Sequence, residues 1–358
     1  MNVHQLLSGA GPHDAVTQQA LAYRSLFDRW GWGGTDLEAA IDPRLDGRVR
    51  LLEHLGPAPG DVLLFHYSAY APRLRDALEL PQRKLLVSHN ITPARWLWAY
   101  DAGSAVQCAV GRSQLGRFAR AVDLATGVSA YNAAELAAAG ARATGVLPIL
   151  FDREALGAPG WSGAAAARGA GEGPQHGPPA ILFVGRLTPH KRQDEVIRAF
   201  ALYRRLHAPD ARLVLVGSPQ PLGFDDRLRE LAAELAPGAV RIEGGLAPAE
   251  LWARYREADA FLCLSEHEGF CIPLLEALHF GVPVIARPAG GVPEVAGDAA
   301  LLVEDRDPAV IAELLALAVG DAGLRATLRE RGERRLEAFA FERTAERIRA
   351  AVEQVAAA

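Results

Sequence analysis

Short apolar runs alternate with longer helical patterns along the whole chain. The runs are clearest in the second half and are continuous rather than alternating, as at 180–184 (AILFV) and 212–216 (RLVLV). Continuous apolar runs are typical of strands buried on both faces of a parallel sheet. Segments between them, such as 193–206 and 225–235, have helical spacing and suffice for right-handed crossovers. The pattern therefore predicts an α/β fold in both halves. The predicted strands are 61–66, 84–88, 124–128, 180–184, 212–216, 258–264 and 283–286.

A change of composition separates the two halves. Residues 156–179 are rich in Gly, Ala and Pro and have no periodic apolar face, which is typical of a linker or surface excursion. We predict a Rossmann-like domain at 1–153, the linker at 154–179 and a second Rossmann-like domain at 180–336. We expect the helix in 337–358 to pack back towards the first domain. Two such domains facing each other across a cleft would bind ligands at the carboxyl ends of their strands.

Composition and charge narrow the function classes. Half of the 358 residues are hydrophobic, and 38 basic against 43 acidic residues leave a net charge of −5. The apolar content excludes a disordered chain, and the weak negative charge argues against a nucleic-acid partner. Three cysteines look too few and too scattered for a disulfide framework or zinc site. The first residues lack the pattern of a signal peptide, and no apolar run is long enough to span a bilayer, so we expect a cytoplasmic protein.

The first candidate site follows the strand at 180–184. Gly185 and Arg186 leave the strand end, and Lys191 stands just before the next helix. An arginine fork and a lysine ammonium suit a diphosphate, and the helix that begins near Gln193 offers its positive end to the same anion. The alternative is a pair of solvated surface cations.

The second candidate site follows the strand at 258–264. Glu268 lies in the loop before a helix predicted to begin near Cys271 or Ile272, and Glu276 lies about one turn inside that helix. The amides of Gly269, Phe270 and Cys271 are expected to point outward as donors. Two carboxylates could accept hydrogen bonds from separate vicinal diols. Alternatively, a glutamate near a helix N-terminus only complements the helix dipole.

Taken together, these motifs resemble those of the retaining glycosyltransferases of family 4, which have the GT-B fold. The resemblance rests on the Gly-Arg-Leu…Lys segment, on Glu268-x7-Glu276 within SEHEGFCIPLLEA, and on GVPVIARPAGGVPEVAGDAALLVED after it. It implies that Arg186 and Lys191 hold the donor diphosphate and that Glu276 binds the nucleotide ribose. Glu268 and the three amides after it would hold the transferred sugar.

The first half resembles the family less strongly. Its segment LLVSHNITPARWLW, together with SEHEGFC, is similar to a bacterial mannosyltransferase-like subset. The resemblance implies that His89 faces the donor sugar; the alternative is a satisfied histidine that caps a strand end. Where many relatives have a double-glycine loop near the phosphates, this chain has the loop from Ser8 to Asp14, in which Gly11 allows close approach to a ligand.

The resemblance implies transfer of a hexose, with mannose favoured, from a nucleotide-diphospho-sugar to a hydroxyl with retention at the anomeric carbon. GDP-mannose is the expected donor and a UDP-hexose the second choice; the acceptor would be a saccharide or lipid-linked saccharide of surface polysaccharide or glycolipid synthesis. Leaving-group stabilisation would drive the reaction. With no Asp-x-Asp motif after an early strand, we expect no metal and no cofactor.

Other readings remain. The segment 111–120 places Arg112, Arg117 and Arg120 among apolar residues, which suits peripheral membrane contact or an ordinary solvated helix. A phosphorylase would need a lysine near the C-terminus, and a dehydrogenase would need G-x-G-x-x-G after a strand; neither is present. A non-catalytic nucleotide-sugar-binding partner of another transferase stays open.

Overall fold

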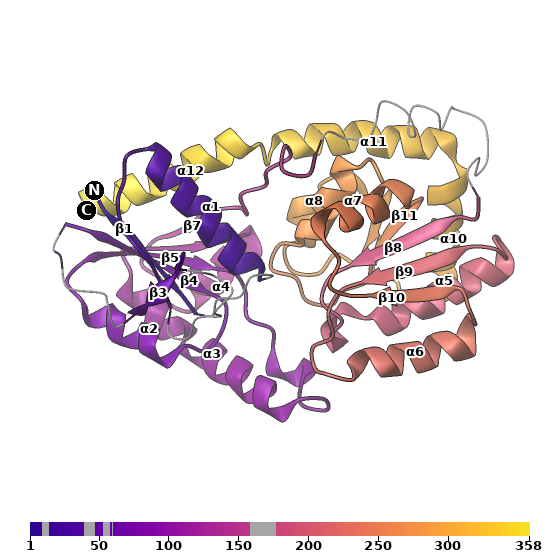
Figure 1. Cartoon of the computed structure of the whole chain (residues 1–358), viewed down its shortest axis with the longest axis horizontal. Coiled ribbons are helices and arrows are strands. Elements are labelled where there is room, and N and C mark those ends of the chain that lie inside the picture. Colours follow the sequence, from indigo (N-terminus) through magenta and orange to yellow (C-terminus); the bar gives the residue numbers. More distant parts are fainter. Residues whose placement is uncertain (9–13, 39–46, 53–57, 59, 158–176) are drawn as a thin grey trace. The chain divides into compact units, whose positions relative to one another are not determined.

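The computed structural model describes residues 1–8, 14–38, 47–52, 58, 60–157 and 177–358. These residues form two compact units, residues 1–151 with 339–358 (unit 1) and residues 152–338 (unit 2). Each unit is a parallel sheet with helices on both faces (Figure 1). The predicted α/β class with two Rossmann-like domains is therefore confirmed. The predicted linker falls largely on residues 158–176, outside the described part.

Unit 1 contains a seven-stranded sheet in the order β3-β2-β1-β4-β5-β6-β7. One face packs on α2, α3 and α4 through a core in which the Phe118 ring lies against Tyr67, with centroids 4.5 Å apart. The helices α1 and α12 lie on the other side (Figure 1). The strands are β1 Val3–Leu7, β2 Asp36–Glu38, β3 Arg50–Leu51, β4 Val62–Tyr67, β5 Arg83–Ser88, β6 Leu124–Gly127 and β7 Thr144–Val146. The helices are α1 Ala15–Arg29, α2 Pro72–Asp76, α3 Ala102–Ala121, α4 Ala130–Ala138 and α12 Phe341–Ala357.

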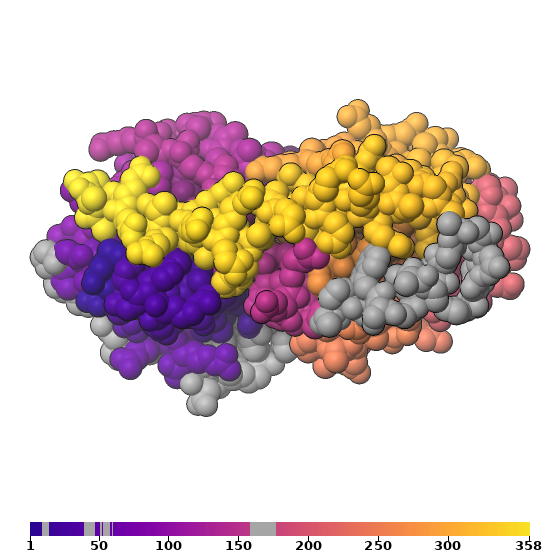
Figure 2. Space-filling view, turned by 90° about the horizontal axis from the view of Figure 1, so that it is seen from above, coloured from indigo at the N-terminus to yellow at the C-terminus, as the bar shows by residue number. Residues whose placement is uncertain are grey.

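The C-terminal helix α12 belongs to unit 1. It lies beside α1 at the surface (Figure 2), where the Arg29 guanidinium stacks over the Phe341 ring and Arg349 over Trp30. Its apolar side is buried, with Ile348 and Val352 fully inaccessible. Burying two such side chains is worth about 3–6 kcal/mol before entropic costs, so the helix is an integral layer of this unit.

Unit 2 contains a six-stranded sheet in the order β10-β9-β8-β11-β12-β13. Its main core lies between the sheet and α5, α6 and α10, and includes Phe183, Phe200 and Ile311. The strands are β8 Ala180–Val184, β9 Arg212–Val216, β10 Val240–Glu243, β11 Ala260–Cys263, β12 Val284–Ala286 and β13 Ala300–Leu302. The helices are α5 Gln193–Leu206, α6 Phe224–Leu235, α7 Pro248–Glu257, α8 Ile272–His279, α9 Val292–Ala296, α10 Pro308–Gly320 and α11 Ala322–Glu337.

The predicted strands match observed ones, with small shifts at their ends. β11 begins at Ala260, two residues later than predicted, and the Asp259 carboxylate just before it accepts a hydrogen bond from the Ala180 amide. The prediction left out β1, β2, β3, β7, β10 and β13. Most of these are short or lie toward a sheet edge. β1 is central, but His4 and Gln5 interrupt its apolar run.

Candidate functional site

The order of strands in unit 2 reverses between β8 and β11. From β8 the chain moves outward to β9 and β10, and it then returns to β11 on the other side before β12 and β13. In open parallel sheets, ligands bind at the carboxyl ends of strands beside such a reversal. Here the two strand ends carry the loops with Lys191 and Glu268, so the fold brings both sequence-predicted segments to one place.

Lys191 and Glu268 form a close ion pair there. The Lys191 Nζ lies 2.6 Å from Oε1 and 2.7 Å from Oε2 of Glu268. Their side chains are 16% and 7% exposed. Burial lowers the pKa of Lys191, but the charge of Glu268, the two neighbouring thiols and the hydrogen bonds to Glu268 together outweigh burial, so the pKa is raised overall and the ammonium stays charged. The pair presents one buried cation at the end of β8.

Two of the three cysteines lie beside this pair, so the expectation of scattered cysteines is wrong for them. The Sγ atoms of Cys263 and Cys271 are 4.0 Å apart, because one ends β11 and the other precedes α8. With Glu268 they form a buried group of metal-ligand type. However, the Lys191 ammonium already contacts both Glu268 oxygens, where a bound cation would need that carboxylate. The residues thus fit an ion pair better than a metal.

Cys271 adopts a left-handed backbone conformation, with φ of 80°. Such a conformation costs a residue with a side chain about 1–2 kcal/mol relative to glycine. Both Cys271→Gly and Cys271→Ala remove the thiol, but only glycine relieves the backbone. We expect chemical denaturation to find the glycine variant more stable by about 1 kcal/mol. Equal stabilities would contradict the strain.

Glu276 is held by a tyrosine. The Tyr255 hydroxyl donates to Glu276 Oε2 at 2.6 Å, from helix α7 to helix α8. Burial raises the pKa of Glu276 to about 7, and the hydrogen bond from Tyr255 only partly opposes that shift. Tyr255 is fully buried. It was not predicted from the sequence, because a tyrosine on an apolar helix face carries no sign of a carboxylate partner. Glu276 is thus poised to change charge near neutral pH.

A network of arginines and glutamates ties the two loops to helix α5. Arg192 donates to Glu266 Oε1 at 2.6 Å, and Arg287 donates to Glu195 Oε2 at 2.6 Å and to the Leu264 carbonyl at 2.7 Å. Each of these arginines and glutamates lies within three residues of the end of a strand or helix, but the arginines are far from these hydrogen-bond partners in the sequence. These residues were not predicted from the sequence, and they hold the loop after β11 in place.

A backbone contact fixes the position of Glu268 itself. The Gly291 amide donates to the Glu268 carbonyl at 2.9 Å, and Gly290 has a positive φ of 58°. A Cβ on Gly290 would overlap that same carbonyl oxygen. The double glycine therefore lets the segment before α9 pass directly beneath Glu268.

The remaining predicted donor residues lie on the same loops. Gly185 follows β8 with φ of 150°, and the exposed Arg186 side chain donates to Gln220 Oε1 at 2.7 Å. The predicted start of the helix after Glu268 is confirmed, since α8 begins at Ile272. Gly269 and Phe270 both have interactions within the protein, and the role of their amides as donors to a ligand stays a prediction.

His89 lies in unit 1, directly after β5. Its Nε2 is 2.9 Å from Nδ1 of His66, and the two rings stack. Burial lowers the pKa of His89 to about 4, so the ring is neutral at physiological pH. Gly11 lies outside the described residues.

The arginines of the segment 111–120 are engaged within unit 1. Arg112 pairs with Glu135 at 2.7 Å, Arg117 pairs with Glu79 at 3.1 Å, and Arg120 donates to a backbone carbonyl. In the described part of the chain, no helix is both long enough and apolar enough to cross a bilayer. Peripheral membrane contact stays a prediction.

The second half of the chain is similar to a known protein family. Residues 170–335 match the family model of the Glycosyl transferases group 1. The matched segment contains Arg186, Lys191, Glu268 and Glu276, the charged residues on which the resemblance rests. The findings support this family, and with it the expectation of an enzyme of the glycosyltransferase class.

Curated relatives match this chain over part of their own length only. D-inositol 3-phosphate glycosyltransferase from Salinispora arenicola is 37% identical over 172 residues, which cover 46% of this chain and 38% of the relative. The matched part thus spans well under half the length of the curated relatives. These findings do not confirm a mannosyltransferase subset.

Solved structures cover the whole chain at low identity. Sucrose-phosphate synthase from Thermosynechococcus elongatus has a TM-score of 0.75 and 17% identity over 99% of both chains. Anabaena HepE in complex with UDP and glucose has a TM-score of 0.71 and 16% identity over 99% of this chain and 100% of that one. Both show likeness of fold, in agreement with two Rossmann-like domains.

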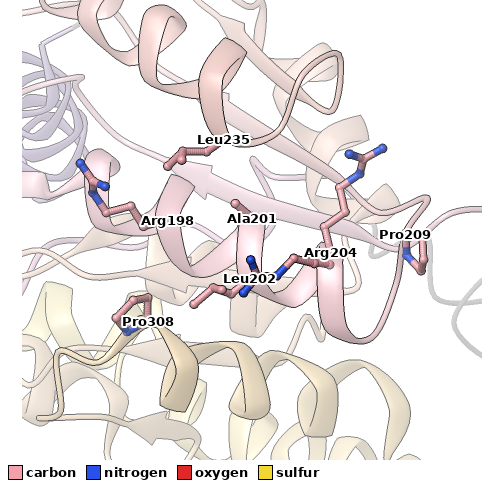
Figure 3. Close-up of a pocket in the computed structure, with 8 residues that line it drawn as sticks. Arg198, Ala201, Leu202, Arg204, Pro209, Leu235 and Pro308 are labelled. Carbon is pink, nitrogen blue, oxygen red and sulfur yellow. The ribbon is translucent and has the colours of Figure 1, made fainter.

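A surface pocket of unit 2 is separate from the candidate site. It has a volume of about 630 Å³ and lies against α5, between Leu235 of α6 and Pro308 of α10 (Figure 3). Arg198 and Arg204 line its sides, and no predicted site residue of the described part of the chain does. The candidate site is therefore defined by its charged side chains at the strand ends, not by this hollow.

Proposed function

We propose that the protein is a retaining glycosyltransferase that moves a hexose from a nucleotide-diphospho-sugar to a hydroxyl acceptor. The observation that carries the proposal is the buried Lys191–Glu268 pair at the β8 and β11 ends, with Glu276 on the following helix. The family match and the solved complex of a fold neighbour with UDP and glucose support nucleotide-sugar binding.

The proposed mechanism rests on charge. As the bond from the anomeric carbon to the leaving oxygen breaks, negative charge builds on the diphosphate, and Lys191 and Arg186 would meet it. The acceptor would attack on the departing side and lose its proton to the leaving phosphate. Glu268, held by Lys191, would orient the sugar and stabilise positive charge at the anomeric carbon. No metal enters this scheme, so we expect activity to survive EDTA.

The favoured donor is inferred from the sequence resemblance, and it can be tested directly. HNITP and SEHEGFC favour GDP-mannose, whereas the fold neighbour is solved with UDP. We would measure thermal stabilisation and slow donor hydrolysis with GDP-mannose, UDP-glucose, UDP-N-acetylglucosamine and ADP-glucose. A donor at about 100 times its Kd stabilises the fold by about 2.7 kcal/mol. For acceptors, saccharides, lipid-linked saccharides and D-inositol 3-phosphate would be compared, the last because a relative is named for it.

Two outcomes separate the alternatives. Transfer to an acceptor by one nucleotide sugar supports the enzyme and identifies its donor. Binding of a nucleotide sugar without hydrolysis or transfer would favour the non-catalytic partner. Against that alternative, all four charged residues of the site are present in the sequence. A chain that responds to no nucleotide sugar would contradict both.

Nucleotide affinity is expected to rise as the pH increases through about 7, the raised pKa of Glu276. The ionised carboxylate accepts hydrogen bonds from both ribose hydroxyls, and each pH unit below the pKa lowers its ionised fraction about tenfold. The effect on folding stability has the opposite sign, because the folded state holds the Glu276 proton more tightly than the unfolded chain does. Ionisation of Glu276 therefore lowers stability by its full amount above about pH 7. This loss shrinks as the pH falls below about 7 and is gone below the pKa of the unfolded chain. Calorimetric titration between about pH 5.5 and 8.5 measures the affinity. Glu276→Gln cannot titrate, so its profile is expected to be flatter; two parallel profiles would rule out this role.

A further inference from the structure

A chain of hydrogen bonds in unit 1 ends on His89. Arg24 contacts Asp36 Oδ1 through Nε at 3.1 Å and Nη2 at 2.7 Å. Gln5 Nε2 donates to the same Asp36 oxygen at 2.8 Å, and Gln5 Oε1 lies 2.8 Å from His66 Nε2. His66 Nδ1 then lies 2.9 Å from His89 Nε2. Gln5, Asp36 and His66 are at most 3% exposed, so water does not substitute for these contacts.

The partners of Gln5 determine which way its amide points. Its Nε2 donates to the Ala20 carbonyl at 2.8 Å as well as to Asp36. A carbonyl oxygen can only accept, and the Asp36 oxygen is surrounded by donors from Arg24, which cannot accept. Both contacts therefore require the NH₂ end, and the oxygen must face His66. The His66 Nε2 must then carry the proton, because the Gln5 oxygen cannot donate.

The proton on His66 in turn determines the proton on His89. Burial and the nearby His89 keep the pKa of His66 well below its usual value, so the ring is neutral and has one proton. With that proton on Nε2, His66 Nδ1 is an acceptor, and His89 Nε2 must donate to it. His89 is also neutral, so its Nδ1 has no proton. Within the described residues, no protein donor bonds this nitrogen.

We propose that Gln5 and His66 hold His89 in the Nε2–H tautomer, so that His89 Nδ1 is a hydrogen-bond acceptor at the carboxyl end of β5 and selects a ligand with a hydroxyl at that position. Gln5 and His66 are positioning residues, because they act through His89. That the hydroxyl belongs to a sugar rests on the proposed function, whereas the tautomer does not. The unprotonated His89 Nδ1 discriminates against a ligand that presents only a hydrogen-bond acceptor to it. In that case the lone pair of Nδ1 and the lone pair of the ligand atom would both be buried without a donor.

The tautomer can be measured without any ligand. In protein labelled with ¹⁵N-histidine, two-bond proton–nitrogen correlations distinguish a protonated from an unprotonated ring nitrogen, and His66→Phe and His89→Phe assign the signals. We expect both rings to be neutral and to carry the proton on Nε2 alone. In Gln5→Leu, His66 loses its acceptor, and the His89 signals are expected to move toward a mixture of tautomers. A wild-type His89 with its proton on Nδ1, or with two protons at neutral pH, overturns the inference.

A matched variant controls for damage to the fold. Gln19 is a second buried glutamine in unit 1, with both ends of its amide bonded to the Leu150 backbone. Among the described residues it makes no hydrogen bond to His66 or His89. Gln19→Leu is expected to leave the His89 signals unchanged. If both variants shift them equally, the effect is general loosening, and the assignment to Gln5 fails.

The kinetic arm uses deoxy sugars. With the donor found above, Gln5→Leu is expected to lower kcat/KM about three- to tenfold, the worth of one neutral hydrogen bond. For a donor analogue that lacks the hydroxyl bonded by His89, wild type and Gln5→Leu should be equal. A uniform loss with every analogue would mean a merely structural role. If no donor reacts, the proposed function fails while the measured tautomer still decides the inference.

Discussion

Lys191→Ala is expected to lower glycosyl transfer about a hundred- to thousandfold. The variant removes the buried cation that would meet the developing charge of the diphosphate, and loss of one such group costs about 3–4 kcal/mol of transition-state stabilisation. The same change leaves the Glu268 carboxylate buried without its partner, which costs about 3–5 kcal/mol of folding stability. Steady-state transfer rates and chemical denaturation measure the two losses separately.

A second variant distinguishes catalysis from folding. In Lys191→Ala/Glu268→Gln the buried charge is gone together with its partner, so most of the stability is expected to return while transfer stays slow. Arg229→Ala is the control for removing a cation, since Arg229 is exposed and, among the described residues, pairs with Asp225 and Asp226 of its own helix. Recovery of full activity in the double variant would show that Lys191 serves only to neutralise Glu268.

Gly290→Ala is expected to destabilise unit 2 by about 2–5 kcal/mol and to abolish nucleotide-sugar binding. Two costs add: the positive φ disfavours any side chain by about 1–2 kcal/mol, and forcing a methyl group into a packed site costs about 1–3 kcal/mol. The new Cβ would meet the Glu268 carbonyl, so relief of the overlap must move Glu268 away from Lys191. Denaturation curves and donor titration report the two effects.

Gly245→Ala provides the matched comparison. Gly245 also has a positive φ of 67°, but no atom of the described part of the chain lies within 4 Å of a Cβ placed there. Only the backbone cost applies, so a loss of about 1 kcal/mol with unchanged binding is expected. If Gly290→Ala were as mild as Gly245→Ala, the close approach beneath Glu268 would not be needed to build the site.

The charged residues of the candidate site could be predicted because each lies close to the end of a recognisable element. Lys191 precedes α5, and Glu268 lies between β11 and α8, both of which have clear apolar patterns. The residues that surround these charged side chains could not be predicted in this way. Tyr255 looks like a core residue until the structure brings α7 beside α8, and Cys263 and Cys271 look scattered until one strand end and one helix start meet.

The sequence by itself determined the α/β class, most strands of the central sheet regions and the loops that carry the charged side chains, because continuous apolar runs and turn residues are local signals. Tertiary structure alone decided the reversal of strand order at β8 and β11, the pairing of Lys191 with Glu268 and the path from Gln5 through His66 to His89. Because the polar residues His4 and Gln5 interrupt the apolar run of β1, the sequence pattern did not predict this central strand. Both polar residues are tolerated because the folded chain gives each a hydrogen-bond partner, Asp61 for His4 and Asp36 and His66 for Gln5. These partners are far away in the sequence, so no local pattern indicates them.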